Sequence, residues 1–199
     1  MPPGPADPFL DPISKEISIT TTRSLDKFEV RVFLCGSTTK TGSSRGSRKR
    51  LSDIRAFLKS KLNSELKRCV VRLGEHKENI RAFAEATGPR ASNLADHEFA
   101  LVKNHMDLVI IFPCSPGSFA ELGMFSTTKR VAEKMRIFIN QNYKKHKSYV
   151  MLGPVRAAEQ NNARVIFVNY RNRSDVWREV KYLVLEVKAA KRKKRLFGD

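Results

Sequence analysis

The sequence predicts a doubly wound α/β fold, in which helices cover both faces of a mainly parallel sheet in a Rossmann-like arrangement of three layers. Short apolar segments alternate along the chain with segments whose apolar residues recur every three or four positions. The run DLVIIF is apolar after its first residue, as expected of a central strand buried on both faces. The 199 residues, 41% of them hydrophobic, suffice for one domain and are too few for two ordinary ones.

Five segments are predicted to be strands because they are short, apolar and rich in β-branched or aromatic residues. The first of them, EVRVFLC, ends at Gly36 and Ser37 and is followed by a polar, basic loop. The most hydrophobic of them is DLVIIFP. The predicted strands cover residues 29–35, 69–73, 107–113, 136–140 and 164–170.

Helices are predicted between these strands. Apolar residues from Leu51 to Leu62 recur at helical spacing, Ser92 offers an N-cap for a helix that reaches His105, and Ser174 offers one for the last helix. Residues 75–88 fit either a helix or a structured excursion. The predicted helices cover residues 51–65, 92–105, 118–135 and 154–161 and the segment from 174 onward.

The chain is predicted to have three parts: an irregular, Pro-rich arm at 1–28, the α/β domain at 29–187 and a basic tail at 188–199. No apolar run approaches the roughly 18 residues that span a bilayer, and the N-terminus lacks the pattern of a signal peptide. We therefore expect a cytoplasmic protein that does not bind membranes.

The three cysteines, Cys35, Cys69 and Cys114, all lie in or beside apolar, strand-like segments. Their odd number and their positions favour reduced core residues over a disulfide framework. The sequence has no CxxC motif, no histidine pair at helical spacing and no carboxylate cluster. We accordingly expect neither a metal ion nor a cofactor.

The formal net charge of +18 indicates a polyanionic partner, because cations that contact phosphates release condensed counterions. The excess is concentrated at residues 40–50, 144–147 and 188–195. One basic stretch alone could be a solvated helix end, but three separate ones favour a nucleotide or nucleic acid. The candidate phosphate-binding residues are Arg45, Arg48, Lys49, Lys191, Arg192, Lys193, Lys194 and Arg195.

Two loops of small residues follow predicted strands, at 35–39 and at 114–118. In doubly wound sheets, ligands bind beyond the carboxyl ends of the strands, where helix N-termini present unpaired N–H groups. Each loop alone could be an ordinary turn, and neither matches the P-loop or the dinucleotide-binding fingerprint. The candidate substrate-binding residues are Gly36, Ser37, Ser115, Pro116, Gly117 and Ser118.

Glu121 follows the second loop and is predicted to lie in the first turn of the next helix. An acidic side chain there could simply stabilise the helix dipole, by about 0.3–1 kcal/mol. A catalytic carboxylate facing the crevice at the strand ends would occupy the same place.

The segment SPGSFAELGMF resembles the signature of nucleoside 2-deoxyribosyltransferase-like proteins and of the wider SLOG superfamily, which includes the cytokinin-activating phosphoribohydrolases. The resemblance covers roughly residues 29–170. In its compact form, SPGSFAELG also resembles effector proteins encoded beside bacterial retrons and other antiphage systems. Such effectors are held by a reverse transcriptase and its RNA–DNA hybrid, and the basic surface fits a partner of this kind.

The resemblance implies cleavage of the N-glycosidic bond of a nucleoside, nucleotide or NAD-like molecule. Glu121 would be the nucleophile or the electrostatic stabiliser of an oxocarbenium-like carbon. A second carboxylate would orient the sugar hydroxyls. Glu98 fits that position best and Asp96 is the alternative, although Glu98 could also be a solvated helix residue. The resemblance is also compatible with a homo-oligomer in which a neighbouring subunit completes the pocket.

The chain departs from these families at two points. The phosphoribohydrolases carry a PGG-x-GT-x-x-E loop where this chain has SPGSFAE, which argues against their monophosphate substrate. Pro113 and Cys114 replace the Asp-rich approach of the deoxyribosyltransferases, which favours hydrolysis, or binding without turnover, over transfer between bases. Two functions other than an enzyme therefore stay open: a sensor that binds a nucleotide signal, and a basic adaptor that binds nucleic acid.

Overall fold

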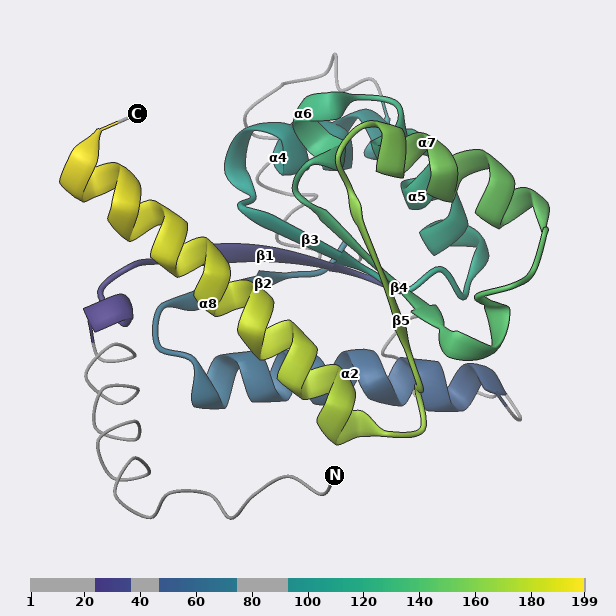
Figure 1. The fold of residues 1–199 in the computed structure, drawn as a ribbon, viewed down its shortest axis with the longest axis horizontal. Coiled ribbons are helices and arrows are strands. Elements are labelled where there is room, and N and C mark those ends of the chain that lie inside the picture. Colours follow the sequence, from purple (N-terminus) through teal and green to yellow (C-terminus); the bar gives the residue numbers. More distant parts are fainter. Residues whose placement is uncertain (1–23, 37–46, 75–92, 199) are drawn as a thin grey trace, which may run out of the picture.

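The computed structural model describes residues 24–36, 47–74 and 93–198, with residues 47–53 in their backbone only. It contains a sheet of five parallel strands in the order β2-β1-β3-β4-β5 (Figure 1). The predicted fold class and the five predicted strands are confirmed, most of them with their ends trimmed by one or two residues. The strands are β1 Val30–Cys35, β2 Cys69–Arg72, β3 Leu108–Ile111, β4 Met135–Asn140 and β5 Arg164–Val168.

The order of the strands reverses beside β1. Val32 of β1 lies opposite Val71 of β2 on one side and opposite Leu108 of β3 on the other. The chain moves outward from β1 to β2, returns to β3 on the other side of β1, and then continues to β4 and β5. The carboxyl ends of β1 and β3 therefore meet at the point where doubly wound sheets bind ligands.

Two groups of helices cover the sheet (Figure 1). Alternate residues of β1 point to opposite faces, so Leu34 packs with α2 and α8, and Phe33 packs with α4 to α7. A hydrophobic core lies on each face of the sheet. The helices are α2 Ser47–Glu65, α4 Leu94–His105, α5 Pro116–Ser126, α6 Lys129–Ala132, α7 Arg156–Gln160 and α8 Arg173–Phe197.

The predicted helix at 118–135 is wrong in its bounds and is divided into α5 and α6. Ser115 is the N-cap of α5 and Pro116 takes the first helical position, where its missing N–H costs nothing. The helix thus begins two residues earlier than predicted. Glu121 consequently lies in its second turn and not in the first, so it does not serve as a first-turn acid for the dipole.

Two helix starts also differ from the prediction. Asn93 caps α4, and its side chain accepts the N–H of Asp96, whereas Ser92 lies outside the described residues. Asn172, and not Ser174, caps α8 by accepting the N–H of Asp175. The segment predicted as a short helix begins with a π turn, Met151–Val155, which continues into α7. A 3₁₀ turn, Gln141–Tyr143, follows β4 and was not predicted.

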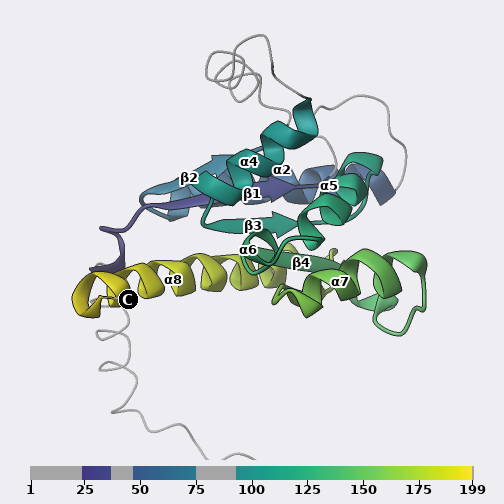
Figure 2. The ribbon, with the colours of Figure 1, turned by 90° about the horizontal axis from the view of Figure 1, so that it is seen from above.

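Helix α8 continues through the predicted boundary at 187/188 to Phe197 and is unbroken along its length (Figure 2). Lys188 is fully buried, and its ammonium donates to the Lys67 carbonyl at 2.6 Å. Arg192 donates to the Ser24 hydroxyl at 3.1 Å. The first part of the predicted tail therefore packs against the start of the described chain. Among the helices described, none is long and apolar enough to cross a membrane.

Candidate active site

Arg55 of α2 holds together the strand ends at the point where the strand order reverses. It is 3% exposed, and its guanidinium donates from Nε to the Leu34 carbonyl and from Nη1 to the Gly36 carbonyl, both at 3.1 Å. Ser115 Oγ lies 3.4 Å from the same Gly36 oxygen, which links the loop after β3 to the end of β1. Gly36 has a φ of 157°, a backbone conformation that residues other than glycine rarely adopt.

Glu98 of α4 and Glu121 of α5 converge on Gly74, just beyond the end of β2. A methyl group placed on Gly74 would lie 3.2 Å from Glu98 Cδ and 3.3 Å from Glu121 Oε1, and it would collide with Glu98 Oε1. Both glutamates are half-buried. The absence of a side chain at 74 therefore allows two carboxylates from different helices to occupy one small volume at the carboxyl end of the sheet.

Cys35, the last residue of β1, lies within electrostatic reach of both carboxylates. Burial raises the pKa of its thiol well above the ordinary range, and the charges of Glu121 and Glu98 raise it further. Arg55 acts on the same thiol in the opposite direction. Cys35, Arg55, Glu98 and Glu121 thus form a single electrostatic cluster, which we call the carboxylate site.

The sequence interpretation did not identify Arg55 or Gly74 as parts of a site, and it included Cys35 in a candidate loop without giving its side chain a role. Arg55 had a detectable signal, because it lies four residues after Leu51 and three before Leu58, on the apolar stripe of the predicted helix. A charged residue on such a stripe has to find buried partners. Gly74 had only the weak signal of a glycine that follows a predicted strand.

The serines of the loop before α5 are hydrogen-bonded within the loop. Ser118 is 1% exposed, its hydroxyl accepts the N–H groups of Cys114 and Ser115, both at 2.9 Å, and it donates to the Ser115 carbonyl. Ser115 in turn accepts the N–H of Ser118. Pro116 and Gly117 are exposed, and nothing lies within 4 Å of where a Gly117 side chain would begin. The predicted role of this loop in ligand binding stays a prediction.

Asp96 does not lie with the two glutamates. It is exposed, and its carboxylate accepts a hydrogen bond from the Asn93 side chain at 2.8 Å, which completes the cap of α4. Of the other candidates, Ser37 and Arg45 lie outside the described residues. Arg48 and Lys49 lie in α2, where only the backbone is described.

The basic residues of α8 lie at the opposite end of the sheet from the carboxylate site. The ammonium of Lys191 donates to the Asp107 carboxylate at 2.7 Å and to the Glu29 carbonyl at 2.8 Å, just before β3 and β1. Lys193, Lys194 and Arg195 are exposed. No group of three or more His, Cys, Asp or Glu side chains that could hold a metal ion occurs within the described part of the chain.

A cavity of about 760 Å³ opens at the carboxyl ends of β3, β4 and β5. Its lining combines Phe119 and Tyr143, whose rings can stack, with several amide side chains and Arg171. Amides offer both donors and acceptors to a nucleobase edge or a sugar, and the volume suits a small-molecule ligand. The amides are Asn140, Gln141, Asn142 and Asn169, which the sequence places at or near the ends of two predicted strands.

Comparison with known proteins identifies relatives of this chain. The model of the family described as "STM3845 retron effector protein" matches residues 51–197. A protein of Escherichia coli named "Retron Ec86 putative ribosyltransferase/DNA-binding protein" is 36% identical over 61 residues. That alignment covers 31% of this chain and 20% of the relative, so the chain matches about a fifth of the relative's length.

Proposed function

The chain belongs to the STM3845 retron effector family, and we propose that it acts there as an N-glycosidase that cleaves the base–sugar bond of a nucleoside, nucleotide or NAD-like molecule. The observation that carries the proposal is the convergence of Glu98 and Glu121 on Gly74, at the carboxyl end of the sheet. Many enzymes that cleave glycosidic bonds use a pair of carboxylates.

The proposed reaction breaks the bond between the anomeric carbon and a base nitrogen. The base leaves with the bonding electrons, and positive charge develops on the sugar. Glu121 stabilises this charge or forms a transient ester with the anomeric carbon, and Glu98 accepts hydrogen bonds from sugar hydroxyls. Water then supplies the hydroxyl of the free sugar, and its proton balances the charge of the released base.

Arg55 supports this arrangement electrostatically. Two carboxylates close together repel each other. The Arg55 guanidinium is fixed by the Leu34 and Gly36 carbonyls and lies within electrostatic reach of the site. In our proposal its positive charge offsets part of this repulsion, so that both carboxylates can face the same sugar.

The cavity lined by Phe119, Tyr143 and the amides lies at the same end of the sheet, although neither glutamate lines it, and its chemistry suits a base and a sugar. The exposed N-terminus of α5, at Pro116 and Gly117, is suited to a phosphate because helix N-termini favour anions. The resemblance of SPGSFAELG to the deoxyribosyltransferase-like and SLOG proteins favours the same reaction class. The word "ribosyltransferase" in the name of the Escherichia coli relative agrees with it.

We further propose that the activity serves antiphage defence and is restrained by a reverse transcriptase with its RNA–DNA hybrid. Membership of a retron effector family supports this partner, and so does the net charge of +18. Free enzyme of this kind would be toxic to the cell, because nucleotide pools would lose their bases.

A sensor without turnover is the second candidate, and the bonding of the α5 loop favours it. The hydroxyls of Ser115 and Ser118 are engaged within the loop, which gives a ligand a rigid surface and offers no hydroxyl nucleophile. A rigid pocket of this kind could hold a nucleotide signal without cleaving it.

Mass spectrometry of free base tests the proposal, after purified protein has been incubated with a panel of nucleosides, nucleotides and NAD. Release of base from at least one member supports an N-glycosidase. If a nucleotide raises the melting temperature but no base appears on long incubation, the sensor is correct. If neither occurs and nucleic acid binds with a steep salt dependence, the protein is an adaptor.

A further inference from the structure

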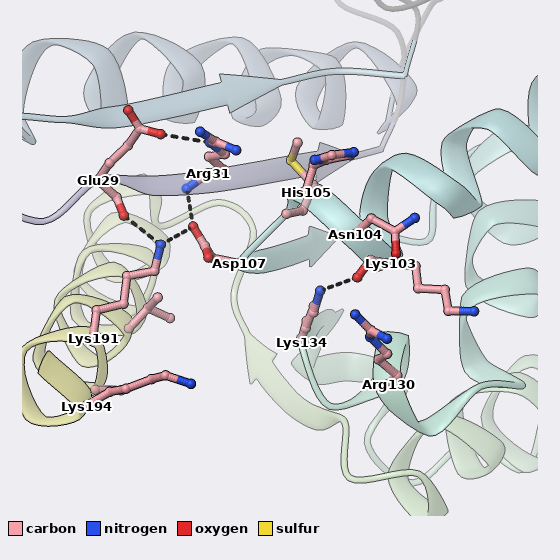
Figure 3. Close-up of a pocket in the computed structure, with 13 residues that line it drawn as sticks. Glu29, Arg31, Lys103, Asn104, His105, Asp107, Arg130, Lys134, Lys191 and Lys194 are labelled. Carbon is pink, nitrogen blue, oxygen red and sulfur yellow. Dashed lines mark hydrogen bonds and ion pairs between the residues drawn. The ribbon is translucent and has the colours of Figure 1, made fainter. Parts of the chain in front are cut away.

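A second cavity, of about 660 Å³, lies at the opposite end of the sheet from the carboxylate site (Figure 3). It is bordered by the residues that precede β1 and β3, by the C-terminal end of α4, by the segment that joins α6 to β4, and by α8. None of the residues that form the carboxylate site lines it.

One wall of this cavity is fixed by Asp107. Its carboxylate accepts the backbone N–H of Arg31 at 2.8 Å and the ammonium of Lys191 at 2.7 Å, and Lys191 also donates to the Glu29 carbonyl (Figure 3). These bonds join β1, the start of β3 and α8. The wall is therefore formed before any ligand arrives, and a ligand does not have to order it.

The charge of the lining is strongly positive. Its two carboxylates each face a cation, since Glu29 pairs with Arg31 at 2.8 Å and Asp107 with Lys191. The remaining charged residues of the lining are all basic. They are Lys103 from α4, Arg130 from α6, Lys134 from the segment before β4 and Lys194 from α8.

The ammonium of Lys134 is hydrogen-bonded within the protein. It donates to the carbonyls of Val102 and Lys103, at 3.2 and 2.8 Å, and so caps the C-terminal end of α4. Burial lowers its pKa, and the nearby charge of Arg130 lowers it further. The positive charges of Lys134 and Arg130 therefore lie close enough to repel each other. A bound anion would reduce this repulsion.

We propose that this cavity binds the phosphodiester backbone of a nucleic acid, chiefly through Arg130 and Lys103. The cations come from three helices and from the segment before β4, and they do not converge on one point: the Lys103 side chain points away from Lys191 and Lys194, and its ammonium lies 6.0 Å from the centre of the Phe99 ring (Figure 3). Such a spread suits several successive phosphates better than a single small anion. The exposed Lys193 and Arg195 extend the positive surface along α8 beyond the cavity.

This site goes beyond the proposed glycosidase and is independent of it. Nucleic acid bound here would lie at the amino ends of the strands, whereas a substrate would lie at their carboxyl ends. Both could be bound at once, so the cavity could attach the protein to its nucleic acid while the carboxylate site stays accessible.

Fluorescence anisotropy with a short labelled DNA duplex tests the proposal on the full chain. The test variant is Lys103→Gln with Arg130→Gln. The matched control is Lys67→Gln with Arg156→Gln, which removes the same charge at exposed positions outside the cavity. We expect the test variant to bind about tenfold or more weakly at moderate salt, and its plot of log K against log salt to be less steep by about two. Melting temperatures of both variants check that they are folded.

An equal loss of affinity for the duplex in the test variant and in the control would overturn the proposal, because the affinity would then depend only on the net charge. An unchanged salt slope in the test variant would also overturn it. The proposal would fail as well if inorganic phosphate or an acidic peptide displaced the duplex from the wild-type protein as effectively, per unit charge, as unlabelled duplex. Glu121→Gln should bind the duplex as the wild type does, which separates this test from that of the glycosidase.

Discussion

Arg55 organises the carboxylate site through its contacts with two backbone carbonyls. A buried guanidinium is stable only when its donors are satisfied, and here the Leu34 and Gly36 carbonyls accept two of them. The residue thereby fixes the end of β1 and places a positive charge beside two glutamates. At this scale the site depends on residues that only the three-dimensional structure brings together.

Gly74→Ala should impair catalysis without unfolding the protein. The added methyl would collide with Glu98 Oε1 and lie 3.3 Å from Glu121 Oε1, so at least one carboxylate must move. A displacement of about 1 Å can reduce turnover by about 100-fold. The measurement is the rate of base release together with the melting temperature.

Gly123→Ala is the matched control for that substitution. Gly123 lies inside α5, and nothing stands within 4 Å of its added carbon. Alanine should therefore stabilise the helix by about 0.4–1 kcal/mol and leave turnover unchanged. Equal activity in the two variants would show that the approach of Glu98 to Gly74 has no catalytic importance.

Cys35 and Cys69 should resist alkylation in the folded protein at pH 8. Burial raises the pKa of both thiols, that of Cys69 to about 11, so little reactive thiolate is present well below that pH. At pH 8 the thiolate fraction of Cys69 should be about one in a thousand, and its reactivity should rise about tenfold per pH unit. Peptide mapping after treatment with iodoacetamide measures both. Modification of folded Cys35 as fast as in denaturant would contradict the described environment.

At the scale of single elements, α5 shows how a short loop fixes the position of a functional residue. Ser115 as N-cap and Pro116 as the first helical residue determine where the helix begins, and this sets the turn on which Glu121 lies. The sequence analysis predicted a helix that carries Glu121, but it placed the start of this helix two residues too late. The reason is that Ser115 and Ser118 are equally good caps in isolation, and only the bonds of Ser118 within the loop distinguish them.

Ser118→Ala should destabilise the protein by about 1–3 kcal/mol, because the N–H groups of Cys114 and Ser115 would lose their acceptor. Ser64→Ala provides the comparison, since Ser64 is exposed and its single bond to Lys61 is 3.5 Å long. That substitution should change stability by less than about 0.5 kcal/mol. Urea unfolding of both variants gives the free energies. Equal values would mean that the Ser118 hydroxyl does not hold the loop.

The strands were more predictable than the helix boundaries. The sequence LVII is apolar throughout because β3 is buried on both faces, and that pattern needs no knowledge of the rest of the fold. The π turn at Met151–Val155 and the separation of α6 from α5 depend on packing between helices, which leaves no local signal. Similarly, Glu98 could be proposed from its distance to the next strand, but its meeting with Gly74 could not.

At the scale of the whole molecule, α8 joins the two ends of the described chain. Its apolar residues pack against the sheet, and its last turns contact residues 24–31 and Lys67 through Lys188, Lys191 and Arg192. The sequence analysis treated residues 188–199 as one basic tail, because the sequence does not reveal which lysines are buried. Lys188 differs from its neighbours only in its position on the apolar stripe of the helix.

Truncation after Val187 should therefore destabilise the protein by about 2 kcal/mol or more, since the Lys67 carbonyl would lose Lys188 and the Asp107 carboxylate would lose Lys191. Truncation after Arg195 removes only Leu196, Phe197 and the two residues that follow them. Because Leu196 and Phe197 are 61% and 79% exposed, this change should have little effect. Thermal unfolding compares the two. A shorter chain as stable as the longer one would show that residues 188–195 are dispensable for folding.

The central claim is that Glu121 acts on a base–sugar bond, and the rate of base release by Glu121→Gln tests it most directly. Glu159→Gln is the control. Glu159 is an exposed carboxylate on α7, and its substitution removes the same charge. We predict that Glu159→Gln matches the wild type, while Glu121→Gln is slower by about 100-fold or more and keeps the wild-type melting temperature. Base release by Glu121→Gln at the wild-type rate would contradict the account.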